Sequence, residues 1–378
     1  MPLTAAKCTS CSANLQVDAD KEAAICEHCG TPFIVEKAIN HYTTTNHITA
    51  GVVNVYGGTE QDFVIRGGVL EKYNGAAVDV VIPDGVVAIG SRAFHECKGL
   101  QSVAIPSSVT KLLDGGVSDD YGIFGAFSHC TSLRNVELPS TLRSIGSKAF
   151  FNCSELEMIT IPDSVTTIGD SAFSRCGVKS ITVPRNLKKL DDGIFSRCFK
   201  LKSVTIPDGV KLIGDRAFGL CESLISITLP NSVGALGRHA FGGCTALTRV
   251  VLSENITSIS EQAFSGCSSL CEITIPNKVT KIGEFSFEKC VSLTHIDFPD
   301  SVELIEACAF KGCTSLEHVT GDAAEKWLTR FSDSPFGDER LKAREQSRAW
   351  QRNGLCPHCG GKFGMFNGKC KQCGKPRS

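Results

Sequence analysis

Ten cysteines recur at a nearly constant interval through the middle of this 378-residue chain. Seven of the nine intervals are 23 residues long, and the other two are 22 and 33 residues. The ten positions are Cys97, Cys130, Cys153, Cys176, Cys198, Cys221, Cys244, Cys267, Cys290 and Cys313. A period of this length is typical of a solenoid, in which each repeat forms one coil and packs only against its neighbours.

The residues around each cysteine repeat with the same period. Alignment on the cysteines gives the unit I-P-x-x-V-x-x-I-G-x-x-A-F-x-x-C-x-x-L-x-x-I-x, with ten copies between residues 82 and 320. The segment L-x-x-I-x-I before a proline predicts a short strand with alternating burial, and the proline ends that strand without removing a bond from its middle. V-x-x-I-G predicts a second extended segment. A-F-x-x-C predicts one tight helical turn that places Phe and Cys inside.

This unit resembles the BspA-type leucine-rich repeats. The resemblance implies a mainly β, right-handed solenoid with the strands on its concave side and short helical turns. Members of that family are usually secreted or surface adhesins and recognition proteins, so the resemblance also implies a recognition protein. Two repeats depart from the unit. The fourth lacks one residue after Cys176 and has Val178 in place of the strand leucine, and the second carries ten extra residues around 114–122. We interpret that insertion as a surface loop, with a ligand or cation site as the alternative.

The repeat cysteines are interpreted as buried, reduced thiols, because a free cysteine behaves as a small hydrophobic side chain. Cys271 and Cys308 fall outside the repeat register, and Cys308 occupies the position of Arg216 in another repeat, which predicts exposure. A reactive role for these two remains an alternative, although no flanking basic residue favours a lowered thiol pKa.

Two further groups of four cysteines lie near the ends of the chain. Each has the form CxxC…CxxC, with 14 intervening residues in the first group and 10 in the second. Two such pairs supply the four thiolates of a tetrahedral structural Zn²⁺ site. Both segments resemble rubredoxin-type zinc ribbons, and residues 8–34 resemble the short ribbons at the front of many bacterial proteins. We therefore predict two structural Zn²⁺ ions, held by Cys8, Cys11, Cys26 and Cys29 and by Cys356, Cys359, Cys370 and Cys373.

The segments between these modules predict caps for the solenoid. Residues 322–331 supply apolar side chains, Trp327, Leu328 and Phe331, that can close the last coil, and residues 338–352 predict a polar helix. The predicted organisation is a zinc ribbon (1–39), an irregular β cap (40–81), ten repeats (82–320), a C-terminal cap with a basic helix (321–353) and a second zinc ribbon (354–378).

The start of the chain, MPLTAAKCTSC, has no apolar segment of the kind found in secretory signals. No apolar run approaches the roughly 20 residues of a membrane span. Twenty cysteines without a signal favour metal thiolates and free thiols over disulfides. These features predict a cytoplasmic protein.

Three classes of function were compared. The sequence contains no GxSxG, HExxH or Walker A motif, so it does not favour an enzyme, and no catalytic residue is assigned. Nucleic-acid binding is the second hypothesis, because residues 340–378 contain ten basic residues and one acid, and such clusters neutralise phosphates. That activity is assigned to residues 338–378. A non-enzymatic scaffold that binds a protein partner is the first hypothesis.

The third and fifth positions of each strand L-x-x-I-x-I are predicted to face solvent. In the middle repeats these positions are serine and threonine, whereas the last four repeats carry a varied charged set that can specify a partner. This candidate partner-binding set is Arg249, Glu272, His295, Asp297 and His318. An ordinary solvated face is the alternative interpretation.

Overall fold

The computed structural model describes side chains in residues 61–114, 124–329, 331, 334–353, 355–362, 370–373 and 375–376, and the backbone of four strands before residue 35. The chain divides into two units, Met1–Tyr56 and Gly57–Ser378. In the first unit, β1 (Leu3–Lys7) pairs antiparallel with β2 (Asn14–Asp18), and β3 (Ala23–Ile25) pairs antiparallel with β4 (Pro32–Ile34).

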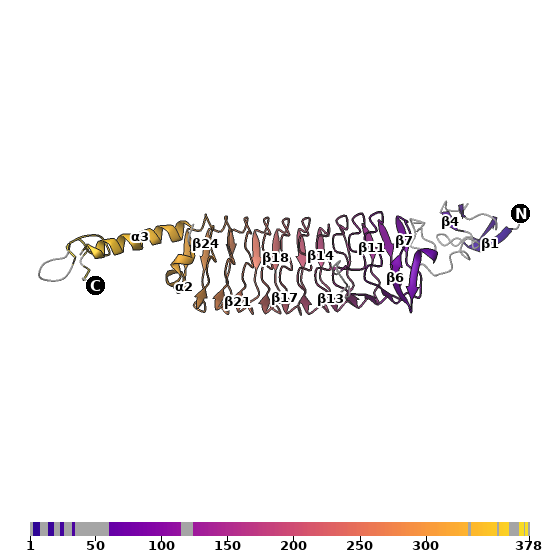
Figure 1. Cartoon of the computed structure of the whole chain (residues 1–378), viewed down its shortest axis with the longest axis horizontal. Helices are drawn as coiled ribbons and strands as arrows, with labels where there is room; N and C mark the ends of the chain where they lie inside the picture. The colour runs from indigo at the N-terminus through magenta and orange to yellow at the C-terminus, as the bar shows by residue number, and fades with distance from the viewer. Residues whose placement is uncertain are drawn as a thin grey trace. The chain divides into compact units, whose positions relative to one another are not determined.

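The second unit is a mainly β solenoid of about 11 turns, as the repeat period predicts. Its three-residue strands form one row in Figure 1, and they come from the L-x-x-I-x-I segments. They are β7 (Asp79–Val81), β9 (Ser102–Ala104), β11 (Asn135–Glu137), β14 (Ser180–Thr182), β16 (Ser203–Thr205), β18 (Ser226–Thr228), β20 (Arg249–Val251), β22 (Glu272–Ile273, two residues), β24 (His295–Asp297) and β26 (His318–Thr320). They pair in parallel within four groups, β7-β9-β11, β14-β16, β18-β20-β22 and β24-β26, with a register of one repeat, so that Ser180 lies opposite Ser203.

A second row of two-residue strands comes from the V-x-x-I-G segments. These strands are β8 (Ala88–Ile89), β10 (Lys111–Leu112), β12 (Ser144–Ile145), β13 (Thr167–Ile168), β15 (Lys189–Leu190), β17 (Leu212–Ile213), β19 (Ala235–Leu236), β21 (Ser258–Ile259), β23 (Lys281–Ile282) and β25 (Leu304–Ile305). The row begins with a hairpin of β5 (Phe63–Arg66) and β6 (Val69–Tyr73), which follows a short 3₁₀ turn, η1 (Glu60–Asp62). Because β6 pairs in parallel with β8, and β7 with β9, residues 60–81 form a coil that precedes the first repeat.

The shorter fourth repeat interrupts the row of three-residue strands. No strand forms at residues 158–160, at the end of the third repeat, whereas the fourth repeat forms β14 and buries Val178 as the leucine it replaces would be. Gly177 lies so close to the preceding coil that an added Cβ would come within 2.2 Å of the Ser154 carbonyl oxygen. The missing residue is therefore accommodated by a close backbone approach that only glycine allows.

A continuous column of phenylalanine rings fills the centre of the solenoid. From Phe94 to Phe310, each ring stacks on the ring of the next coil, with centroids 4.9–5.7 Å apart. Tyr73 extends the column at the first coil, at 5.1 Å from Phe94, and Phe331 extends it past the last coil, at 4.9 Å from Phe310. One coil cannot cover such a ring by itself, so the core exists only through stacking.

The A-F-x-x-C segments form consecutive tight turns. In one coil the Gly219 N–H donates to the carbonyl of Arg216, and the Cys221 N–H donates to that of Phe218, in the i→i−3 pattern. In nine of the ten coils, two residues have left-handed backbone, such as Arg216 with φ 53° and Leu220 with φ 61°. Left-handed residues end a helix, which explains why each turn is limited to these few residues.

The C-terminal end of the solenoid is closed as the apolar residues of 322–331 predict. A short helix α2 (Asp322–Lys326) leads into the 3₁₀ turn η2 (Leu328–Phe331), where Leu328 and Phe331 are buried. Helix α3 (Pro335–Arg352) then begins, three residues before the predicted start, because the Ser334 hydroxyl accepts a hydrogen bond from the Gly337 N–H and Pro335 occupies the first turn. Among the described residues, no helix is long and apolar enough to cross a membrane.

Candidate functional site

The charged set of the last four repeats lies on the solvent-facing side of the three-residue strands. In β20, β24 and β26 the middle residue is buried and the two outer residues are exposed, as predicted. All five predicted residues, Arg249, Glu272, His295, Asp297 and His318, are exposed. We call this set the strand-face patch.

The parallel register aligns four of these side chains in one line. Arg249 lies opposite Glu272, and His295 lies opposite His318 on the neighbouring strand. Across the gap between these two pairs, the His295 Nε2 is 3.9 Å from the Glu272 carboxylate. Along this exposed line an arginine is followed by a glutamate and then by two histidines, so the line offers a partner both a basic and an acidic group.

Asp297 stands beside this line at the fifth strand position. Its carboxylate accepts a hydrogen bond of 2.5 Å from the hydroxyl of Thr320 on β26. Two exposed apolar side chains flank the patch on the same side, Val251 at 40% and Ile225 at 51% exposure. The patch thus combines charges with accessible apolar surface, as the centre and rim of protein interfaces do.

The second group of predicted ligands comes together at the C-terminus. The Sγ atoms of Cys356, Cys359, Cys370 and Cys373 all lie within 4.8 Å of one another, with Cys356 3.6 Å from Cys373 and Cys359 3.4 Å from Cys370. A zinc ion with Zn–S bonds of about 2.3 Å has S–S separations of about 3.8 Å. This donor set and spacing fit a tetrahedral metal ion, so the cluster can hold one.

Backbone and helix contacts fix the geometry of this cysteine cluster. Gly360, with φ 71°, turns the chain after Cys359, and its N–H donates to the Cys356 carbonyl. The Trp350 ring of α3 packs on that glycine, because an added Cβ would come within 2.7 Å of the ring. The N–H groups of Cys373 and Gln372 hydrogen-bond to Cys370 and hold its pKa at about 6. Thiolate character at one ligand favours metal binding.

The other predicted sites lie outside the described residues. These include Cys8, Cys11, Cys26 and Cys29, and all of the insertion at 114–122 except Asp114. The Asp114 carboxylate accepts a hydrogen bond of 2.6 Å from the Ser147 N–H on the next coil. Cys271 is exposed and Cys308 is partly buried.

The repeat cysteines have a structural role that the sequence did not indicate. The thiol of Cys221, for example, donates to the Phe195 carbonyl of the preceding coil at 3.1 Å, and nine of the ten repeat cysteines make this bond at 2.9–3.2 Å. Nine are buried, Cys97 is partly buried, and all ten are free thiols, as predicted. The only signal in the sequence is the strict spacing of Cys and Phe.

Burial changes the acidity of these thiols. Burial raises the pKa of Cys244 to about 12 and that of Cys313 to about 12. Desolvation also raises the pKa of Cys221 and of Cys267 well above the ordinary value. Since the thiolate is the nucleophile, these raised pKa values disfavour reaction of Cys221, Cys244, Cys267 and Cys313 in the folded chain.

The comparison with protein families decides what this solenoid is. The family model described as the BspA type leucine rich repeat region matches residues 72–118, 124–248 and 235–343, which make up well over half of the chain. The chain belongs to this family. BspA-type repeats are typical of surface or protein-interaction proteins, and no catalytic family is indicated. No curated protein matches the sequence.

Several solved structures are similar to this BspA-type chain. A leucine rich cell surface protein from Faecalibacterium prausnitzii has 26% sequence identity and a TM-score of 0.41, with 73% of this chain and 97% of that chain covered. A leucine-rich repeat protein from Bacteroides ovatus has 26% identity and a TM-score of 0.39, with coverage of 72% and 88%. The pneumococcal vaccine antigen PcpA has 18% identity and a TM-score of 0.34, with coverage of 68% and 77%.

The cytoplasmic location predicted from the sequence is wrong by this comparison. Proteins with BspA-type repeats include one described as a cell surface protein and one described as a vaccine antigen. The prediction relied partly on the number of free cysteines. In the structure most of these thiols are buried and hydrogen-bonded to carbonyl groups. Their reduced state therefore follows from the fold and does not indicate a cellular compartment.

Proposed function

We propose that this chain is a non-enzymatic recognition scaffold whose strand-face patch binds a protein partner. The observation that carries the proposal is the line of exposed side chains Arg249, Glu272 and His295, which brings a basic, an acidic and an imidazole group next to one another. The stacked coils hold these groups one repeat apart, so a partner with complementary groups loses little of its binding energy to ordering this surface.

The middle repeats support the same assignment by contrast. On β16 and β18 the equivalent exposed residues are serine and threonine at every position, for example Ser203 and Thr205. These side chains are compatible with an exposed strand position and carry no charge. The switch to charged residues and histidines from β20 onward is therefore not required by the fold, and it favours a binding role at that end.

The test replaces the patch by the residues that the middle repeats carry. We expect the full chain to capture a protein partner from native lysate, and the triple variant Arg249→Ser, His295→Ser and Asp297→Thr to lose that capture at unchanged thermal stability. A matched control removes the charge at the equivalent fifth position of an early strand, with Glu137→Thr on β11. If the triple variant captures the same proteins as the parent, or if the control loses them equally, the patch is not the binding surface.

We further propose that Cys356, Cys359, Cys370 and Cys373 hold one structural Zn²⁺, and that the cysteine pairs of the N-terminal segment hold a second. Support for the first comes from the four converging thiols. Support for the second comes from chain order, because Cys8 and Cys11 lie between β1 and β2, and Cys26 and Cys29 lie between β3 and β4. A metal bound at such sites contributes directly to folding of the small module around it. We also propose that the chain is organised as the sequence predicts, with one module ending at residue 39, the next at 81, the repeats at 320, and the C-terminal cap at 353.

Nucleic-acid binding by residues 338–378 is the second candidate. One observation favours it: the described part of α3 carries the exposed basic residues Lys342, Arg348 and Arg352, and none of them has an ion pair among the described residues. The full chain should then retard DNA or RNA in a salt-dependent manner, and replacing these three residues by glutamine should reduce the salt dependence. Capture in the protein assay that survives nuclease treatment favours the scaffold instead.

A further inference from the structure

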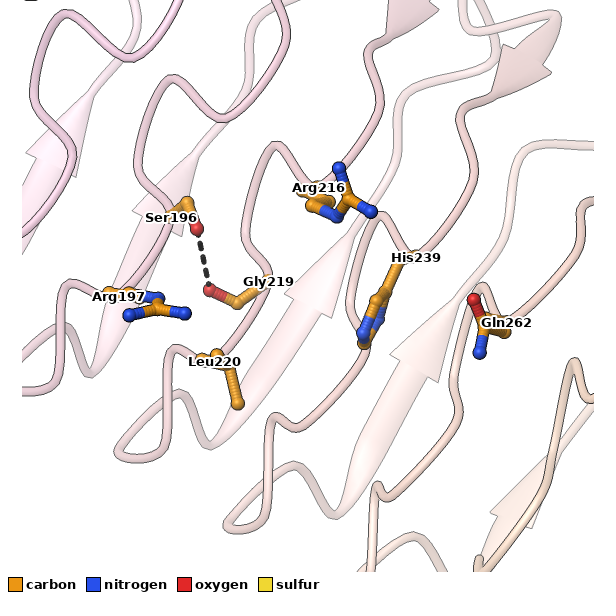
Figure 2. A pocket seen from close by; sticks show the side chains of 7 residues that line it. All are labelled: Ser196, Arg197, Arg216, Gly219, Leu220, His239 and Gln262. Carbon is orange, nitrogen blue, oxygen red and sulfur yellow. Dashed lines mark hydrogen bonds between the residues drawn. The ribbon is translucent and has the colours of Figure 1, made fainter.

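A shallow pocket of about 330 Å³ opens on the turn edge of the solenoid, away from the strand-face patch. Figure 2 shows the side chains that line it, which come from the A-F-x-x-C turns of consecutive coils. Arg216, His239 and Gln262 occupy the same position in three successive coils, and Arg197 projects from the coil before them. The volume is at the small end of the range for ligand sites.

Two arginines line this hollow without a close ion pair. Among the described residues, neither Arg197 nor Arg216 has a carboxylate oxygen within 4.0 Å of its guanidinium nitrogens. The aspartates on the same turns accept backbone hydrogen bonds instead: Asp192 accepts from the Asp215 N–H at 2.8 Å, and Asp215 accepts from the Arg238 N–H at 2.7 Å. Guanidinium groups that are not held by a carboxylate can bind an oxyanion that enters the hollow.

His239 also lines this hollow. Its Nδ1 is buried against Gly242 without a hydrogen-bond partner among the described residues, so a hydrogen bond into the hollow would have to come from Nε2. Burial, with a smaller contribution from Arg216, lowers the pKa of this imidazole. The ring is therefore neutral near pH 7, and it offers a hydrogen bond rather than a further charge.

We propose that this pocket binds a tetrahedral oxyanion, a phosphate or sulfate group, through Arg197, Arg216 and His239. The three side chains come from three successive coils and line the same hollow. A tetrahedral anion presents oxygens in several directions, whereas a carboxylate presents two in one plane. The small volume fits a single oxyanion group and its immediate substituent.

The probe for this proposal is inorganic phosphate, titrated into the full chain by calorimetry at constant ionic strength. We expect a dissociation constant on the order of 1 mM. In the double variant Arg197→Gln and Arg216→Gln, affinity should fall at least about tenfold. At residue 216 glutamine is a suitable replacement because Gln262 occupies the same left-handed turn position two coils later, with φ 55°. Arg185→Gln, at a side chain exposed outside the pocket, is the matched control and should bind as the parent does.

Parallel titrations with sulfate and acetate separate the possible ligands. Sulfate binding that depends on the same two arginines supports the proposal, and the balance between sulfate and phosphate identifies the source of the anion. Acetate binding as tight as phosphate overturns the tetrahedral assignment. No heat of binding in the parent, or equal binding in the double variant, overturns the site itself.

Discussion

The Cys221 thiol donates a hydrogen bond to the Phe195 carbonyl oxygen at 3.1 Å, across the boundary between two coils. The same carbonyl also accepts from the Cys198 N–H, so each Phe carbonyl joins the turn of its own coil to the side chain of the next. The contact that recurs between coils thus has three parts: the Phe ring stacks on the next ring, the Phe carbonyl accepts hydrogen bonds, and the Cys thiol of the next coil donates one of them.

Loss of one thiol should destabilise the solenoid. For Cys221→Ala we expect the free energy of unfolding to fall by about 1 to 2 kcal/mol, because a buried hydrogen bond and part of the packing disappear together. Urea unfolding measures the change. The control Cys271→Ala, at an exposed position outside the row, should stay within about 0.5 kcal/mol of the parent. Equal losses at the two positions would contradict the role assigned to the bond.

The raised thiol pKa values predict a loss of stability at alkaline pH. The pKa of Cys244 is about 12 in the folded chain, against an ordinary value of 9.0. Between these values the unfolded chain loses this proton and the folded chain keeps it, so stability falls as pH rises, by about 1.4 kcal/mol per pH unit for each such thiol. Unfolding of Cys244→Ala at pH 9 to 11, in reductant, should show a slope shallower by that amount. An unchanged slope would mean that this thiol ionises equally in both states.

The ring that ends the aromatic column should matter as much as an internal one. Phe331 is fully buried and stacks on Phe310, so Phe331→Ala should cost about 3 to 5 kcal/mol and increase hydrogen exchange first in β26. Phe199→Ala, at an exposed ring, serves as the control and should change stability little. Normal protection of β26 in Phe331→Ala would show that α2 closes the coil without this ring.

Metal removal should act on the cysteine cluster and leave the solenoid folded. Trp350 packs on Gly360 beside the cluster, so its fluorescence reports on this region, and Trp327→Phe removes the only other tryptophan. A strong chelator should shift the Trp350 emission without changing the circular dichroism of the solenoid.

The double variant Cys359→Ser and Cys370→Ser serves as the reference that lacks the C-terminal metal ion. It should contain one zinc ion fewer per chain, and its emission should not respond to chelator. A chelator response that persists in this variant would place the metal elsewhere.

The strands and their exposed positions could be predicted from the sequence because the period of two in L-x-x-I-x-I determines which side faces solvent. The exposure of Arg249 and the burial of Val250 follow from that rule alone. Closure of the last coil by Phe331 was also predictable, because a solenoid needs an apolar group over its final edge. The thiol–carbonyl bond was not, since a pattern shows which residues are buried and not which atoms meet.

The pocket on the turn edge was missed for a related reason. Arg216, His239 and Gln262 stand at a position of the repeat that holds different residue types in different coils. Their identities therefore do not form part of the repeat pattern. Their spacing of 23 residues is the signal that could have placed them side by side. Only the structure shows that Asp192 and Asp215 accept backbone N–H groups, and that neither Arg197 nor Arg216 forms an ion pair within the described part of the chain.

Because neighbouring coils pack in the same register, the length of the solenoid is set by the number of repeats. Deleting residues 207–229 would join Ile206 to Pro230 and restore the I-P junction of the repeat. Every ring and every thiol would then meet the same partner in the next coil, while the stack became shorter by about 4.8 Å. The distance between the strand-face patch and the first coil can therefore change in steps of one repeat, by insertion or loss of a repeat, while the interior contacts stay the same.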